Sequence, residues 1–118
     1  MKNEKINIAL AGFGNIGSYF YKTVKKNKKS IMIRTGKVPY IKYISARNFK
    51  KKRLIKIPKS KWIKKTLDLV LKDDVDVIVE LIGGADGPAK KLVFSALKNN
   101  KHVITANKAL ISKHGNEL

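Results

Sequence analysis

The sequence predicts an α/β protein built on a doubly wound parallel sheet, and three features of its 118 residues support this fold class. Short apolar runs rich in β-branched residues alternate with longer amphipathic segments, as expected for strands joined by crossover helices. One run, 75–81, has the composition of a strand that is covered on both faces. A glycine-rich turn over 12–17 joins the first apolar run to the first amphipathic segment.

The expected elements follow the order βαβαβαβα. The first strand is expected over Ile6–Ala11, and the first helix over about Asn15–Lys26, where apolar residues recur at helical spacing. The elements expected after them are a polar connection over Asn27–Gly36, a strand over Pro39–Ala46, a lysine-rich loop over Phe49–Lys59, a helix over Lys61–Leu71 with Ser60 as its N-cap, a strand over Val75–Leu81, a helix that Pro88 opens and Asn99-Asn100 ends, a strand over His102–Thr105 and a helix over Ala109–His114.

The turn after the first strand has the G-x-G-x-x-G spacing of a dinucleotide-binding fingerprint, between a strand and a helix as that fingerprint requires. Gly12 permits the tight turn, Gly14 lets a pyrophosphate approach the backbone, and Gly17 lets the helix pack closely on the strand. The helix N-terminus adds unpaired N–H groups and a positive dipole end. A Rossmann-type cofactor site is therefore expected at Gly12, Phe13, Gly14, Asn15, Ile16 and Gly17. A turn that is glycine-rich for structural reasons alone is the alternative.

The formal net charge of +19 invites a nucleic-acid interpretation, but the pattern of the basic residues does not favour one. Lysine accounts for 24 of the 27 basic residues, which run along nearly the whole chain without the interleaved aromatic residues of a stacking platform. We expect no specific nucleic-acid partner, although nonspecific affinity for polyanions at low salt is expected.

Cysteine is absent, which excludes disulfides and thiolate chemistry and suits a reducing compartment. Only six apolar or small residues precede Gly12, too few for a signal-peptide core or a membrane span. His102 and His114 lack metal-ligand spacing with other ligands, so no metal is expected. These observations predict a cytoplasmic protein with no membrane partner.

Four segments carry a more specific pattern than the glycines. They read A-G-F-G-N-I-G-S over 11–18, S-A-R-N-F over 45–49 with Lys52-Arg53 after it, D-V-I-V-E-L-I-G-G over 76–84, and K-H-V-I-T-A-N-K-A-L over 101–110 with H-G-N-E-L over 114–118. Together they resemble the N-terminal NAD(P)-binding domain of homoserine dehydrogenase across essentially the whole chain. The resemblance implies one cofactor domain over 1–118, incomplete at its C-terminus because the family is longer.

In a doubly wound sheet, ligands lie beyond the carboxyl ends of the strands, so these segments are expected to meet in one crevice. Arg47 stands where NAD-preferring folds place an acidic residue, and no Asp or Glu lies between Glu4 and Asp68. An arginine there can bind a 2′-phosphate, with Lys52 and Arg53 as further candidates, so NADP is expected in preference to NAD. The alternative is a solvated basic loop.

The resemblance also implies roles at the nicotinamide end. Lys108 corresponds to a lysine that transfers a proton or polarises the substrate, although a solvated surface lysine is the alternative. Backbone at Gly83 and Gly84 is expected to pass close to the cofactor, unless these glycines only form a turn. Thr105, Ala106 and Asn107 are expected to shape the nicotinamide end. For Glu80 we expect a structural carboxylate with its hydrogen bonds satisfied.

The implied reaction is the interconversion of L-homoserine and L-aspartate 4-semialdehyde by hydride transfer, on the route to threonine and methionine. The family's substrate and dimerisation domain has no counterpart here, so substrate binding and oligomerisation are expected only with that domain. The chain alone is therefore expected to be inactive. A stand-alone dinucleotide-binding or regulatory module is the alternative, and a polyanion-binding protein is a third.

Overall fold

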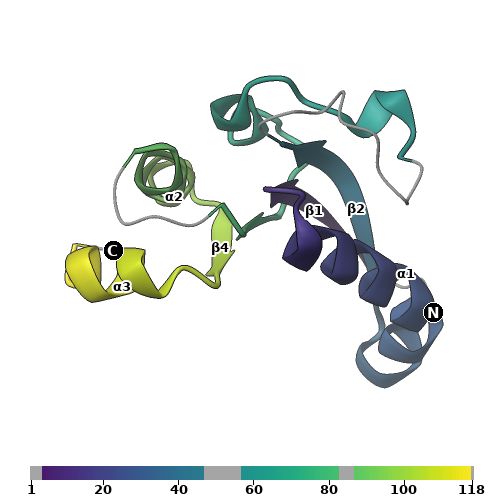
Figure 1. Cartoon of the computed structure of the whole chain (residues 1–118). Coiled ribbons are helices and arrows are strands. Elements are labelled where there is room, and N and C mark those ends of the chain that lie inside the picture. Colours follow the sequence, from purple (N-terminus) through teal and green to yellow (C-terminus); the bar gives the residue numbers. More distant parts are fainter. Residues whose placement is uncertain (1–3, 47–56, 83–86, 118) are drawn as a thin grey trace.

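The computed structural model of the chain describes residues 4–46, 57–82 and 87–117, with Lys108 and Ala109 described by their backbone alone. Helices and strands alternate along these residues, as the sequence predicts (Figure 1). The strands are β1 (Glu4–Ala11), β2 (Lys37–Ser45), β3 (Val77–Glu80) and β4 (His102–Thr105); the α-helices are α1 (Asn15–Thr35), α2 (Pro88–Lys98) and α3 (Lys108–His114); and two 3₁₀ turns are η1 (Lys59–Lys61) and η2 (Thr66–Leu69).

The strands form one parallel sheet in the order β2-β1-β3-β4. The chain leaves β1 on one side to form β2 and returns on the other side to form β3, so the strand order reverses at β1. The carboxyl ends of the strands are level, because Ala11 is in register with both Ser45 and Glu80, and Glu80 with Thr105. This topology confirms the predicted doubly wound α/β class and places its switch point between β1 and β3.

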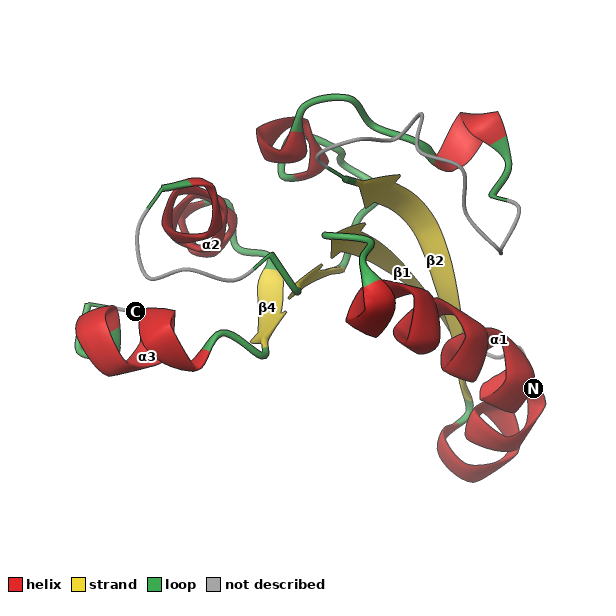
Figure 2. Ribbon diagram, in the orientation of Figure 1, coloured by secondary structure: helices red, strands yellow, loops and turns green. Residues whose placement is uncertain are grey.

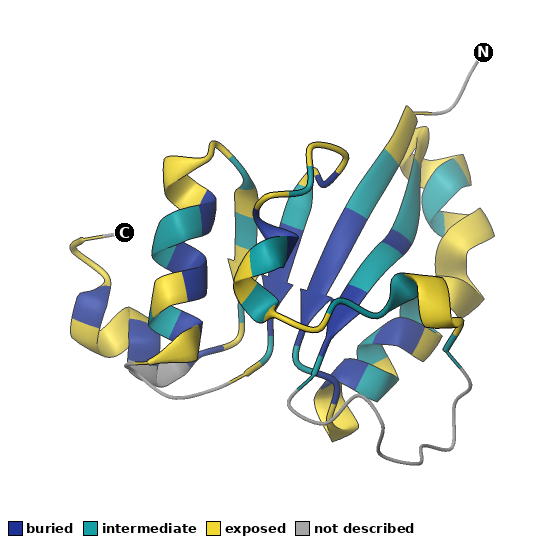
Figure 3. Cartoon of the chain, turned by 90° about the horizontal axis from the view of Figure 1, so that it is seen from above, coloured by how far each residue is buried: buried dark blue, intermediate teal, exposed yellow. Residues whose placement is uncertain are grey.

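Apolar side chains alternate along β1 and fill a core on each face of the sheet. Figure 3 shows buried residues along the central strands and exposed residues on the outer sides of the helices. Ile8 and Leu10 face α1, whereas Ala9 and Ala11 face the side covered by α2 and η2. Figure 2 shows α1 and the η2 segment on opposite sides of β1 and β2. Both faces are covered at β1, whereas Ile104 on β4 is exposed. The ends of the strands are the place where a ligand can meet several elements.

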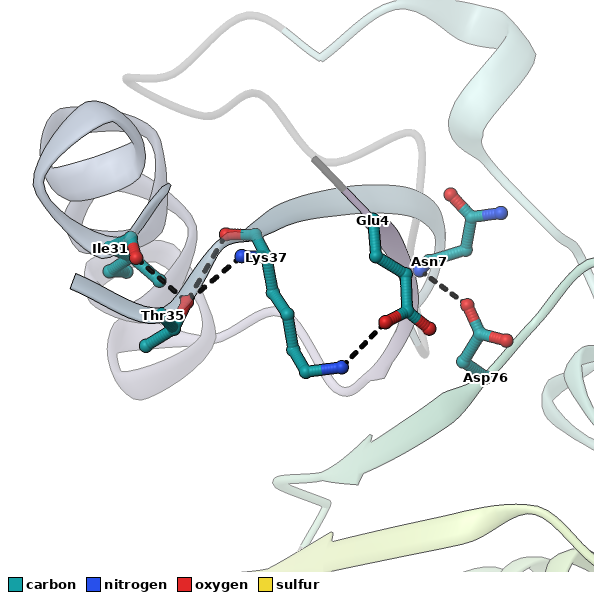
Figure 4. Close-up of polar contacts among 6 residues, drawn as sticks. All are labelled: Glu4, Asn7, Ile31, Thr35, Lys37 and Asp76. Carbon is teal, nitrogen blue, oxygen red and sulfur yellow. Dashed lines mark hydrogen bonds and ion pairs between the residues drawn. The ribbon is translucent and has the colours of Figure 1, made fainter. Parts of the chain in front are cut away.

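Helix α1 continues nine residues beyond the predicted end at Lys26, so the expected polar connection over 27–36 is wrong. The apolar stripe is interrupted after Lys26, but no glycine or proline stops the helix before Gly36, which adopts a left-handed φ of 73° and donates its N–H to the Met32 carbonyl. The Thr35 hydroxyl donates to the Ile31 carbonyl and accepts from the Lys37 N–H (Figure 4). In the described residues, no helix is long and apolar enough to cross a membrane.

The helix expected over Lys61–Leu71 is also absent, since η1 and η2 replace it. The chain at Trp62 and Ile63 lies along the outer edge of β2 instead, where Ile63 donates its N–H to the Ile44 carbonyl over 2.8 Å. Trp62 packs edge-on against the Phe13 ring, with the centroids 5.7 Å apart. Only part of the predicted apolar stripe is therefore buried: Val70 lies in the core, whereas Leu67 and Leu71 are exposed.

The remaining predicted strands and helices agree with the structure to within two residues at each end, and β4 agrees at both ends. Pro88 is the first residue of α2, and Asn99 caps its end, as the sequence predicts. Where β3 begins, the Asn7 N–H donates to the Asp76 carboxylate over 2.8 Å (Figure 4). The Asp76 N–H donates back to the Asn7 carbonyl. These two bonds fix the register of β3 on β1.

Candidate functional site

Three of the segments predicted to form the site meet where the parallel strands end. The turn 12–17 follows β1, residues 81–82 follow β3, and residues 106–107 follow β4. Two backbone hydrogen bonds join them to their neighbours: Gly12 donates to the Ser45 carbonyl over 2.9 Å, and Leu81 donates to the Ala11 carbonyl over 2.8 Å. Arg47, Lys52, Arg53, Gly83 and Gly84 lie outside the described residues.

Gly12 forms the tight turn that its place in the fingerprint predicts. Its φ is +101°, a conformation that L side chains rarely adopt, and a Cβ there would lie 2.9 Å from the carbonyl carbon and oxygen of Leu81. The turn after β1 and the segment after β3 therefore touch through their backbones. Only glycine allows this approach.

Gly17 permits a second close contact, although its partner differs in detail from the prediction. A Cβ at Gly17 would lie 2.4 Å from the Gly12 carbonyl oxygen, so the first turn of α1 packs on the turn itself rather than on the strand. Gly14 is different, because no atom of the described residues lies within 4 Å of a Cβ built there. The space above Gly14 is open, as binding of a pyrophosphate against the backbone requires.

The N-terminus of α1 opens into this space. The first helical hydrogen bond runs from the Ser18 N–H to the Gly14 carbonyl over 2.9 Å, so the N–H groups of Asn15, Ile16 and Gly17 precede the intrahelical ladder. Among the residues that the structure describes, no side chain caps this end, and the first turn has no acidic residue. Asn15 and Ile16 are exposed. A helix end with these properties favours an anion.

Phe13 lies within the turn, but its side chain belongs to the core. Its ring is buried and stacks edge-on against Tyr21 and Trp62, with centroids 6.0 and 5.7 Å away. The prediction of Phe13 as a cofactor-binding residue therefore applies to its backbone alone. Its ring instead anchors the turn on the α1 face of the sheet.

Glu80 joins the ends of β3 and β4. Its side chain is fully buried, and its carboxylate accepts hydrogen bonds from the Ile82 N–H over 2.6 Å and from the Thr105 hydroxyl over 2.7 Å. The Thr105 oxygen accepts in turn from the Asn107 N–H over 3.0 Å. This arrangement confirms the expected structural role of Glu80. The sequence signal was a lone carboxylate at the end of a buried strand, which did not reveal its partners.

The Asn107 side chain is buried and caps α3, so it fixes the backbone at the start of that helix and does not present its amide to the site. Its side chain is only 6 % exposed, and its carbonyl oxygen accepts from the Leu110 N–H over 3.0 Å, which caps α3. Lys108 is the first residue of α3. The Glu80–Thr105–Asn107 series of bonds thus fixes the backbone that carries Lys108 relative to the end of β3.

The described residues contain no group of three His, Cys, Asp or Glu side chains that could hold a metal ion. His102 is exposed on β4, and His114 lies 3.1 Å from Glu117 and edge-on to Phe94. The described residues can therefore bind an anion through the backbone N–H groups at the start of α1. These groups lie at the switch point between β1 and β3, next to the hydrogen-bonded ends of β3 and β4.

Comparisons with known proteins agree with this geometry. Residues 12–118 match the family model described as "Homoserine dehydrogenase, NAD binding domain". Homoserine dehydrogenases of Neisseria gonorrhoeae and Bacillus subtilis are 38% and 34% identical to this chain over 98% of its length. The chain spans about a quarter of these relatives, 26% of each. A crystal structure of S. aureus homoserine dehydrogenase superposes with a TM-score of 0.88 and 38% identity, over 98% of this chain and 29% of that one. The corresponding enzyme of Thiobacillus denitrificans gives a TM-score of 0.87 and 34% identity, over 97% and 26%.

We predict that Thr105→Val lowers the free energy of unfolding by about 1–3 kcal/mol, because it removes one partner from the buried Glu80 carboxylate and one from the Asn107 N–H. Thr105→Ser keeps the hydroxyl and is expected to cost less than about 1 kcal/mol. Urea unfolding followed by circular dichroism measures both. Equal losses in the two variants would show that the hydroxyl bonds do not stabilise the strand ends.

Proposed function

The chain belongs to the homoserine dehydrogenase family as its NAD-binding domain, and we propose that it binds NADP(H) in preference to NAD(H) at the carboxyl edge of the sheet. The observation that carries the proposal is the open space above Gly14, bordered by the uncapped N-terminus of α1. A dinucleotide places two phosphates at such a turn, where N–H groups and the helix dipole stabilise their charge.

Each element of the edge has a proposed part in binding. The backbone of the turn 12–17 holds the pyrophosphate, through Gly12, Phe13, Gly14, Asn15, Ile16 and Gly17. Gly83 and Gly84 let the chain pass close to the cofactor after β3. Thr105 and Asn107 hold the backbone at the nicotinamide end, since their side chains make the bonds that fix β4 and α3.

The preference for NADP(H) rests on charge. Arg47 follows β2 by two residues, and no Asp or Glu lies between Glu4 and Asp68 to bind the ribose hydroxyls. An arginine guanidinium can instead bind a 2′-phosphate through charge-assisted hydrogen bonds. Lys52 and Arg53 are further candidates in the same stretch of sequence.

As part of a complete enzyme, the domain would serve the interconversion of L-homoserine and L-aspartate 4-semialdehyde, in the synthesis of threonine and methionine. The nicotinamide supplies or accepts the hydride. Lys108 transfers the proton or polarises the substrate oxygen, because removal of hydride from an alcohol also requires removal of its hydroxyl proton. The proposed setting is cytoplasmic.

Orientation of two reactants requires groups on both sides of the crevice, and the described residues form the cofactor side. The chain spans about a quarter of the relatives it matches, so substrate binding and oligomerisation are assigned to a second domain. A stand-alone dinucleotide-binding or regulatory module is the second candidate. The carboxyl edge of the sheet supports this second candidate as well. It contains the proposed cofactor turn, and the structure describes no acidic or basic side chain there for catalysis.

The first prediction concerns the turn. Gly14→Val is expected to abolish NADPH binding, since a branched side chain would occupy the space of the pyrophosphate, while thermal unfolding changes little because that space is otherwise open. Gly36→Ala is the matched control: it also meets no atom within 4 Å, lies at the other end of α1, and should lower stability without affecting binding. Fluorescence titration measures both. Tight NADPH binding by folded Gly14→Val would refute the proposed site.

The second prediction concerns cofactor choice. Arg47→Ala is expected to weaken NADPH binding by about 1.5–3 kcal/mol, the worth of a charge-assisted hydrogen bond, and to leave NADH binding nearly unchanged. Lys59→Ala removes the same charge elsewhere and should affect neither cofactor by more than about 0.5 kcal/mol. Calorimetry with both cofactors provides the test. An equal loss for NADPH and NADH would exclude recognition of the 2′-phosphate by Arg47.

The third prediction concerns Lys108. The 118-residue chain alone is expected to show no homoserine oxidation at saturating cofactor, and joining it to a family substrate domain should give activity. In that joined protein, Lys108→Ala should lower kcat by about a hundredfold, the scale of a lost proton-transfer group, whereas Lys98→Ala should not. Steady-state kinetics measures the effect. Turnover by the chain alone, or full activity of Lys108→Ala, would contradict the proposed roles.

A further inference from the structure

The net charge of the chain belongs to one part of the molecule. Basic residues occur almost throughout, but no acidic residue lies between Glu4 and Asp68. Of the 27 Lys and Arg residues, 19 lie within 5–67, and the other eight are balanced by the eight Asp and Glu residues of the chain. The whole formal charge of +19 is therefore carried by the segment that contains most of β1, all of α1 and β2, and η1.

A cavity lies within this segment, between α1, β2 and η1. It has a volume of about 200 Å³ and is open to solvent. Three of the residues that line it are Lys25, Lys28 and Lys61, and two are Tyr21 and Tyr40; no carboxylate is among its described lining residues. A cavity of this size is smaller than the pockets of roughly 300–1,000 Å³ that hold drug-sized ligands, and it suits a small anion such as pyrophosphate.

The ammonium groups near this cavity gather around a tyrosine ring. The Nζ atoms of Lys5 and Lys61 each lie 4.1 Å from the centroid of the Tyr40 ring, and that of Lys28 lies 5.8 Å away. Lys25 is similarly placed over Tyr21, at 5.7 Å. Three of these lysines, Lys25, Lys28 and Lys61, line the same cavity. Their positive charges repel one another, and an anion bound among them would relieve that repulsion.

The described carboxylates do not offset these charges. On this side of the molecule, the described ion pairs are Lys37 with Glu4 and Lys42 with Asp74, and both lie outside the cavity. The positive charge of the lysines also affects Tyr40. The hydrogen bond and the charge of Lys61 lower the pKa of the Tyr40 phenol, and the charges of Lys5 and Lys42 add to this effect, although burial opposes the shift. The local environment therefore favours negative charge.

The structure indicates a small ligand rather than an added β-strand. The cavity lies along the outer edge of β2, where Pro39 has no N–H to donate, and the Ile41 carbonyl already accepts from the Lys61 ammonium over 2.5 Å. Trp62 and Ile63 cover the edge at Ile44. An extended peptide would find few of the backbone partners that strand addition needs.

The cavity is separate from the dinucleotide edge. Tyr40 is in register with Asn7 on β1, whereas the edge begins after Ser45, five residues further along β2. At the rise of a parallel strand, this separation is roughly 16 Å. We propose that the cavity is a second ligand site, which binds a small organic anion carrying two or more negative charges on phosphate groups, with Lys25, Lys28 and Lys61 as its cationic ligands.

Calorimetric titration with pyrophosphate tests this site, in the Gly14→Val protein so that the turn after β1 does not contribute. Salt at about 150 mM screens nonspecific attraction. Lys25→Ala/Lys28→Ala is expected to weaken pyrophosphate binding by about tenfold or more, since two charge-assisted contacts are lost. Lys91→Ala/Lys98→Ala removes two exposed lysines from α2, changes the net charge equally, and should alter binding by less than about twofold.

A second readout places the anion beside Tyr40. Bound pyrophosphate should raise the pKa of its phenol, followed by phenolate absorbance, and Tyr40→Phe should remove that transition. Absence of saturable binding, or equal losses in the two double-lysine variants, would overturn the proposal. Displacement of pyrophosphate by a single-stranded oligonucleotide, with a steep dependence on salt, would overturn it in favour of a polyanion-binding surface. Each result is independent of whether NADPH binds the carboxyl edge.

Discussion

The backbone contact between Gly12 and Leu81 is the constraint on which the rest of the site depends. A side chain at position 12 would lie 2.9 Å from the Leu81 carbonyl, and the positive φ of Gly12 turns the chain sharply out of β1. That turn sets the direction of α1. The first turn of α1 then lies so close to the Gly12 carbonyl oxygen that position 17 must be glycine. The open N-terminus of the helix is therefore aimed over the switch point of the sheet, where doubly wound proteins bind ligands.

The opposite side of this edge is held by hydrogen bonds rather than by glycines. The buried Glu80 carboxylate connects the backbone after β3 with Thr105 at the end of β4, and Thr105 connects onward to Asn107, the cap of α3. A buried carboxylate is costly unless its partners are fixed, so it favours one arrangement of these strand ends. The proposed cofactor site thus combines an open anion-binding turn with the hydrogen-bonded ends of β3 and β4. Lys108, the first residue of α3, follows directly after them.

Local signals predicted the parts of the fold that depend on neighbouring residues. The turn at 12–17, β4 and the Pro88 start of α2 have fixed local requirements, and the sequence predicted them. The second half of α1 was missed because its residues keep helical backbone bonds without an apolar stripe, up to Gly36. At 61–71 the apolar spacing predicted a helix, but Trp62 packs on the distant Phe13 and Ile63 bonds to β2, contacts that local spacing does not reveal. The same contact buries the Phe13 ring. The fingerprint therefore predicted where the turn lies, but not that the side chain of Phe13 points into the core.

The turn after β1 is the proposed binding site of the dinucleotide. Amide chemical shifts of the ¹⁵N-labelled chain during titration with NADPH test it most directly. Saturable shifts are expected, largest at Gly14, Asn15 and Gly17, whose N–H groups border the open space, with small changes at Lys25 and Lys28 on the cavity side of α1. Saturable binding that leaves the turn unchanged and shifts the amides of Lys25 and Lys28 would contradict it.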